Sequence, residues 1–194
     1  MGLVLLLALA GLGLVGCSPA DEAADSSPAG ASSAAMQSGP AASSEAVQPS
    51  TIFLVRHAEK ADEPEDDPGL TPEGRERARD VARLLVDAEI THVHSSDFER
   101  TRHTGQPLAD ELGLSMNLYD HGDPGPFLDE VMATPGRHVI VGHSNTLPDL
   151  AERLGGDGYG EIVEAWEYNR LYILTPSPQG METVLLRFGA PVSP

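Results

Sequence analysis

The chain has 194 residues, which is enough for one folded domain of ordinary size. Its formal net charge of −18 argues against general nucleic-acid binding, because an acidic surface repels the phosphate backbone. The single cysteine, Cys17, excludes an intrachain disulfide and a cysteine-based metal cluster.

Residues 1–16 have the composition of a secretory signal peptide. Residues 2–15 are uncharged and almost wholly apolar, but they are fewer than the about 20 residues that a membrane-spanning helix needs. The run ends in LVGC, which resembles the bacterial lipobox, whose cysteine becomes the lipidated first residue of the mature protein. The resemblance implies a lipid anchor at Cys17 and a location in the bacterial cell envelope, outside the cytoplasm. The alternative is a buried apolar helix with a packed cysteine.

Residues 17–50 consist mainly of Ala, Ser, Pro, Gly and a few acids. They offer almost no large apolar side chains for a core, so we expect a disordered tether. The folded domain is expected to occupy residues 51–194.

From residue 51 onward, short apolar runs alternate with helical patterns. The runs predict strands at 52–55, 91–96, 116–119, 137–142, 170–175 and 183–188. Capping residues and apolar periodicity predict helices at 70–88, where Thr71 fits the N-cap and Ala78, Val81, Leu84, Leu85 and Ala88 form the apolar stripe, and at 98–113 and 146–156. This alternation predicts a three-layer α/β fold, with a mostly parallel sheet and helices on both faces.

Polar residues follow three of these strands directly. The first strand runs into Arg56 and His57, and the fourth is followed by His143. The second strand is followed by a helix that carries Arg100 or Arg102 on its first turns. Because sites in such sheets form beyond the carboxyl ends of the strands, we expect these side chains to meet.

The combination of arginine and histidine indicates phosphoryl chemistry. Guanidinium groups and the free N–H groups of a helix N-terminus match the oxygens of a phosphoryl group. A neutral imidazole beside that group is a nucleophile that can attack phosphorus in line. The pattern therefore predicts phosphoryl transfer through a phosphohistidine.

The segments LVRHAEK, SSDFERTRHT and VIVGHSNT, in this order, resemble the motifs of the histidine phosphatase superfamily, which has the phosphoglycerate mutase-like fold. Its short members, akin to phosphohistidine phosphatases, are most similar. The resemblance implies that His57 is the phosphorylated nucleophile and that Arg56 and Arg100 bind the phosphate. It makes His143 the second histidine, which stabilises charge in the transition state, and leaves Arg102 out of register.

The proton donor to the leaving oxygen is less clear from the sequence. The segment LYDHGDPGP lacks the acid motif of the larger, mutase-type members. Asp120 is the first candidate, with Asp123 and His121 behind it and Glu59 as a fourth. A good leaving group would make a dedicated acid unnecessary.

Further residues are expected around the pocket. Ser144 and Asn145 would cap the next helix and, with Glu59, contact the substrate. The acidic stretch 62–69 is expected to be a solvated loop next to the pocket mouth. His92 and His94 could chelate a metal as an H-x-H pair, but no third ligand accompanies them, so we expect no metal and no cofactor.

Together these features predict a metal-independent phosphatase that hydrolyses phosphomonoesters or phosphoprotein groups through a phosphohistidine intermediate. Its activity is expected to fall as the pH drops through the titration of His57. A phosphoglycerate mutase activity is disfavoured by the missing acid motif and by the predicted export. The alternative from another class is a non-catalytic envelope module that binds a phosphorylated or anionic ligand.

Overall fold

The computed structural model describes residues 50–192. The predicted signal peptide, the lipidation site Cys17 and residues 17–49 of the predicted tether lie outside it and stay predictions. Within the described part, no helix is long and apolar enough to cross a membrane.

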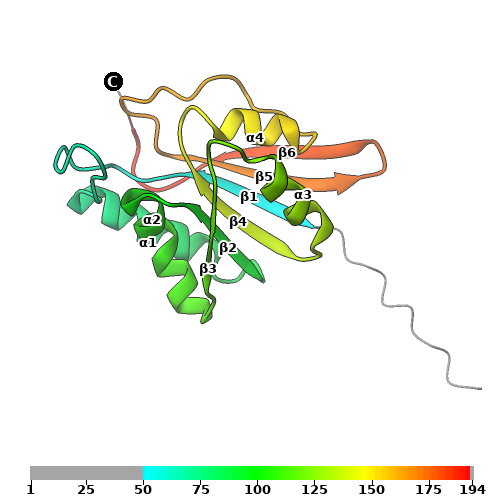
Figure 1. Cartoon of the computed structure of the whole chain (residues 1–194), viewed down its shortest axis with the longest axis horizontal. Helices are drawn as coiled ribbons and strands as arrows, with labels where there is room; N and C mark the ends of the chain where they lie inside the picture. Colours follow the sequence, from blue (N-terminus) through cyan, green and yellow to red (C-terminus); the bar gives the residue numbers. More distant parts are fainter. Residues whose placement is uncertain (1–49, 193–194) are drawn as a thin grey trace, which may run out of the picture. The chain divides into compact units, whose positions relative to one another are not determined.

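One six-stranded sheet organises the domain (Figure 1). The strands are β1 (Thr51–Arg56), β2 (His92–Ser96), β3 (Met116–Tyr119), β4 (Arg137–Gly142), β5 (Arg170–Ser177) and β6 (Gly180–Arg187). The helices are α1 (Pro72–Leu85), α2 (Glu99–Leu112), α3 (Gly125–Ala133) and α4 (Leu147–Arg153). In the order β3-β2-β4-β1-β5-β6, the first four strands run parallel, and β5 and β6 are antiparallel additions.

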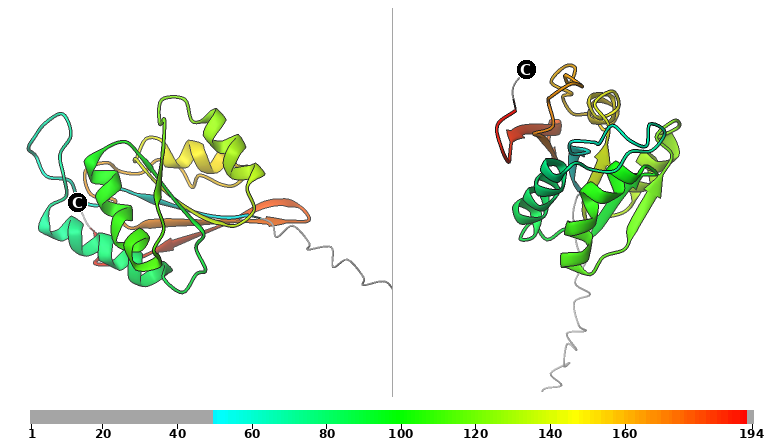
Figure 2. Two further views of the ribbon diagram at one scale, coloured as in Figure 1. Left: turned by 60° about the horizontal axis from the view of Figure 1, so that its bottom comes forward. Right: turned by 90° about the vertical axis from the view of Figure 1, so that its left-hand side faces the viewer.

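Helices cover both faces of the sheet, as Figures 1 and 2 show. Successive side chains of a strand point to opposite faces, so β1 contributes to two cores. Phe53 and Val55 pack with apolar residues of α1 and α2. Ile52 and Leu54 pack with α3 and α4 on the other side. The predicted three-layer α/β fold with a mostly parallel sheet is confirmed.

Three details differ from the sequence predictions. Helix α3 was not predicted, because its start, Pro124 and Gly125, has the composition of a loop, and no side chain caps its N-terminus. Leu84, assigned to the buried stripe of α1, is 45% exposed, whereas Ala82 is buried. The antiparallel direction of β5 and β6 was also not predicted, since apolar runs do not report strand direction.

The strand register brings the polar strand ends together. β1 and β4 pair in parallel, with Val55 opposite Val141 and Arg56 opposite Gly142. The pairing continues one residue further, where the His57 N–H donates to the Gly142 carbonyl at 2.9 Å. The residue after Gly142 is His143, so two neighbouring strands each deliver a histidine to the same edge of the sheet.

Candidate active site

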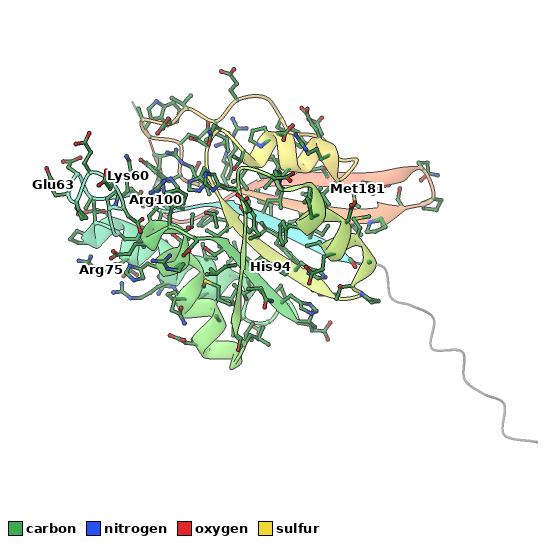
Figure 3. All side chains as sticks on the ribbon, in the orientation of Figure 1. Lys60, Glu63, Arg75, His94, Arg100 and Met181 are labelled. Carbon is green, nitrogen blue, oxygen red and sulfur yellow. The ribbon has the colours of Figure 1, made fainter. Side chains whose placement is uncertain are left out.

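A pocket of about 250 Å³ lies at the carboxyl ends of β1, β2 and β4. It is lined by His57, Lys60, Phe98, Arg100, His121, His143, Ser144, Asn145 and Glu164. Figure 3 shows Lys60 and Arg100 on the same side of the domain as Glu63 of the acidic loop, with His94 away from them. The structure thus brings together six side chains that the sequence analysis named for the site: His57, Arg100, His121, His143, Ser144 and Asn145.

The tautomer of His57 is set by the main chain. Its ring is 4% exposed, and Nδ1 lies 2.8 Å from the carbonyl oxygen of Ala58. A carbonyl can only accept, so Nδ1 carries the proton and Nε2 keeps its lone pair. Burial, with smaller contributions from the charges of Arg56, His143 and Arg100, lowers the pKa of His57 to about 3. The ring is therefore neutral at neutral pH, with one nitrogen available as a nucleophile.

His143 stands beside His57, with 5.4 Å between the ring centroids. Its Nε2 lies 2.8 Å from the Ser96 hydroxyl, and Ser96 in turn lies 3.1 Å from the Thr101 hydroxyl. Thr101 donates its one hydroxyl proton to main-chain carbonyls and accepts from the Ser96 hydroxyl, so Ser96 Oγ is left to accept from His143 and the proton of His143 is on Nε2. Burial above all, and then the charge of Arg100, lowers the pKa of His143 to about 4.

Arg56 is 1% exposed and has an unusual set of partners. Its terminal nitrogens donate to the carbonyls of Val163, Glu164 and Glu167 at 2.8 to 3.3 Å. The guanidinium also lies 4.0 Å from the centre of the Tyr168 ring. Among the described residues, Arg56 Nε is the buried side-chain nitrogen or oxygen without a hydrogen-bond partner. Arg56 therefore holds the loop before β5 and keeps one N–H unpaired.

Arg100 lies in the first turn of α2, and its guanidinium covers the Phe98 ring at 4.3 Å. Burial lowers its pKa, and the carboxylates of Asp67 and Glu164 act in the opposite direction. The Asp67 carboxylate is 3.8 Å from the guanidinium. Arg100 is thus a partly desolvated cation flanked by two carboxylates.

Asp67 belongs to the acidic loop 61–69, which is closed at its base by the 2.9 Å hydrogen bond from the Ala61 N–H to the Gly69 carbonyl. Its Oδ1 accepts the backbone N–H of Glu99 at 2.8 Å. Helix α2 needs this contact because its N-cap residue, Phe98, has no side chain that can accept. The loop expected to be solvated therefore caps the helix that carries Arg100.

The proposed acid candidates separate in the structure. Asp120 is exposed, accepts the Gly122 N–H at 2.8 Å, and lines a neighbouring hollow instead of this pocket. His121 does line the pocket, with its ring 5.5 Å from that of His143. Glu59 pairs with Arg77 at 2.8 Å and is not among the lining residues.

Lys60, Phe98 and Glu164 line the pocket, although sequence reasoning gave them no role. Glu164 could not be found from a motif, because it belongs to a loop without regular structure that Arg56 holds in place from more than a hundred residues away. Lys60 was identifiable only by its position, three residues after His57.

The histidines outside the pocket form a separate cluster. The rings of His92 and His138 stack at 4.5 Å, and His94 Nε2 lies 3.0 Å from His138 Nδ1. His138, which the sequence left without a role, is 1% exposed. Across residues 50–192, no group of three or more His, Cys, Asp or Glu side chains is arranged to hold a metal ion.

Comparison with known protein families gives a match over a stretch that includes His57, Arg100 and His121 and ends before His143. The model of the histidine phosphatase superfamily (branch 1) matches residues 52–121. A probable phosphoglycerate mutase GpmB of Erwinia tasmaniensis is 37% identical over 73 residues, which are 34% of this chain and 34% of the relative. The corresponding protein of Escherichia coli O1:K1 is 37% identical over 71 residues. The chain thus matches about a third of the length of these curated relatives.

Solved structures resemble a larger part of the chain. The protein histidine phosphatase SixA, complexed with tungstate, aligns with a TM-score of 0.57 and 20% identity, over 71% of this chain and 95% of that one. A mycobacterial glucosyl-3-phosphoglycerate phosphatase aligns with a TM-score of 0.52 and 15% identity, over 73% of this chain and 99% of that one. At this identity the likeness concerns the fold. By the model match over residues 52–121 and by the fold of the described domain, this chain is similar to the histidine phosphatase superfamily.

Proposed function

We propose that the protein is a metal-independent phosphatase that hydrolyses phosphomonoesters or phosphoprotein groups through a phosphohistidine at His57. The observation that carries the proposal is the hydrogen bond from His57 Nδ1 to the Ala58 carbonyl. It fixes the proton on the nitrogen that faces the main chain and leaves Nε2 as a nucleophile in a pocket shared with Arg100 and His143.

The pocket supplies donors for a phosphoryl group. Arg100 offers a partly desolvated guanidinium, and His143 lines the same pocket beside His57. A bound phosphoryl oxygen would also give the unpaired Nε–H of Arg56 a partner, and leaving such a buried donor unpaired costs about 1–3 kcal/mol. These donors would stabilise the charge that builds up on the equatorial oxygens.

The reaction then takes two displacements. His57 Nε2 attacks phosphorus, the bond between phosphorus and the leaving oxygen breaks, and that oxygen takes a proton from His121, which replaces Asp120 as the proposed donor because it lines the pocket. Water then attacks the phosphohistidine and returns a proton to His121, the P–N bond breaks, and inorganic phosphate leaves. His57 recovers its neutral state with the proton still on Nδ1.

The test is hydrolysis of an aryl phosphate by the purified full-length chain, with and without a chelator. His57→Asn should lower turnover by at least about a thousandfold, because it removes the nucleophile. The control His103→Asn changes an exposed histidine of α2 and should leave turnover unchanged. Retention of turnover in His57→Asn, or its loss with chelator, would contradict the proposal.

The proton donor is tested in the same assay with an alkyl phosphate, whose leaving oxygen needs a proton more than an aryl oxygen does. His121→Asn should slow alkyl phosphate hydrolysis by about 10²-fold or more. Asp120→Asn should leave it within about twofold, as for an exposed side chain that does not touch the reacting atoms. The opposite ranking would restore Asp120 as the donor.

A further inference from the structure

The charged residues that line the pocket are of both signs. Lys60 and Arg100 are its cationic side chains, and Glu164 is the one carboxylate among the lining residues of the described chain. A phosphoryl group bound next to His57 would be drawn to Arg100. The rest of the substrate would extend away from His57 and lie close to Glu164.

Glu164 is held firmly although it lies in a loop. Arg56 donates to the carbonyl of Glu164 at 2.8 Å and to that of Val163 at 3.3 Å. The Val163 N–H in turn donates to the Glu167 carboxylate at 2.9 Å, and Glu167 is 3% exposed and paired with Arg170. Buried contacts on both sides therefore fix the backbone from which the Glu164 side chain extends.

The charge of Glu164 acts on the site itself. Burial lowers the pKa of both Arg56 and Arg100, and the Glu164 carboxylate opposes this lowering in each case. The carboxylate is thus near enough to both guanidiniums to interact with whatever binds between them.

The pocket continues into a second hollow of about 440 Å³ that shares Ser144, Asn145 and Glu164 with it. The remaining carboxylates of this hollow are Asp149, Glu152 and Glu161, and no basic side chain is among the described residues that line it. At about 250 Å³, the first pocket has room for a phosphoryl group and the first atoms of the leaving group, so a larger leaving group would extend into the second hollow.

We propose that Glu164 is a specificity-determining residue that selects phosphomonoesters with a positively charged leaving group over those with a second anionic group. The proposal rests on the phosphatase function proposed above and names its substrate class. A cation a few bonds from the phosphate would be attracted by Glu164 and by the acidic hollow behind it. A carboxylate in the same place, as in a phosphorylated hydroxy acid, would be repelled.

Three aryl phosphates test this proposal, because their phenols have nearly the same leaving ability and differ in the charge of the side chain. They are tyramine phosphate (cationic), 4-ethylphenyl phosphate (neutral) and the phosphate of 3-(4-hydroxyphenyl)propionate (anionic). Because Glu164 is exposed, its charge is screened almost as in bulk water, and at about 4 Å one unit charge should then change kcat/KM by about fivefold. The full-length wild type should prefer the cationic over the anionic substrate by about 25-fold, and less at high salt.

Glu164→Gln should lower kcat/KM for the cationic substrate and raise it for the anionic one, so that the preference falls at least about fivefold. A residue needed only for folding or for proton donation would shift all three substrates in the same direction. The matched control is Glu182→Gln, which makes the same charge change at an exposed position that pairs with Thr175, at the opposite end of the sheet.

The two proposals fail in different ways. If the wild type hydrolyses none of the three substrates, the phosphatase function fails and the selectivity with it. If it hydrolyses them without a preference for the cation, or if Glu164→Gln leaves the preference unchanged, the inference about Glu164 is overturned and the phosphatase function stands.

Discussion

The surroundings of His57 have two effects, one on the substrate and one on the protonation of the ring. Two arginines near it favour a negative substrate, and burial with these positive charges disfavours a proton on the ring. The second effect keeps the His57 ring neutral, as the proposed nucleophile must be, over a wider pH range than for an exposed histidine. The sequence placed His57 in the site, but the pKa depends on burial and neighbours that only the folded structure specifies.

The pKa of His57, lowered to about 3, leads to a prediction for the pH profile. The neutral form persists until the pH approaches this value, so kcat/KM should stay level from pH 8 to about pH 5, above the pKa of about 4 of His143, once the substrate's own ionisation near pH 6 is accounted for. Two aryl phosphates whose phosphate groups have different second pKa values separate the ionisation of the substrate from that of the protein. A fall near pH 6 that is the same for both would belong to the enzyme and would contradict the lowered pKa.

At the scale of elements, strands and loops differ in how far the sequence predicts them. The strands that carry His57 and His143 could be predicted, because each apolar run has the length and β-branched content of a buried strand. The loop with Glu164 could not, since long-range hydrogen bonds from Arg56 and Arg170 to its carbonyls hold it. Helix α3 lacks a capping side chain and was missed for the same kind of reason: tertiary contacts stabilise it.

The cap on α2 gives a prediction for the acidic loop. Asp67→Ala removes the acceptor for the Glu99 N–H. The loss of this helix cap should lower the free energy of unfolding by about 1 kcal/mol and loosen the turn that holds Arg100. KM for an aryl phosphate should rise about fivefold with a smaller change in kcat. Asp67→Asn keeps an acceptor and should restore most of the affinity, and Asp66→Ala, at an exposed position, is the control. Equal effects of Asp67→Ala and Asp67→Asn would show that the charge and not the cap matters.

At the scale of the whole domain, several histidines are buried in the neutral form. His94 is 6% exposed, and burial, with the charges of His138 and His92, lowers its pKa to about 3. Burial lowers the pKa of His138 as well. In the unfolded chain these rings would titrate near 6.5. The unfolded state therefore binds more protons below that pH, and the stability present above pH 7 is lost as the pH falls through 6.5 toward 3.

Acid should therefore destabilise the domain before its carboxylates are protonated. His94, whose pKa is lowered to about 3, should remove about 2 kcal/mol from the free energy of unfolding between pH 7 and pH 5, as measured by urea denaturation. His94→Gln should make the loss smaller by about that amount, whatever its effect on stability at pH 7. His103→Gln, at an exposed position, should not change the pH dependence. An equal loss in wild type and His94→Gln would contradict the assignment.

The direction of β1 has a practical consequence. The chain enters the described domain at Ser50, whose hydroxyl donates to the Thr134 carbonyl at the amino ends of the parallel strands. The six residues of β1 then lead over roughly 20 Å to the pocket at the other edge. A bead, surface or carrier protein attached directly at residue 50 would lie at the amino ends of the parallel strands, opposite the pocket. The immobilised enzyme should therefore remain accessible to phosphorylated partners as large as a folded protein.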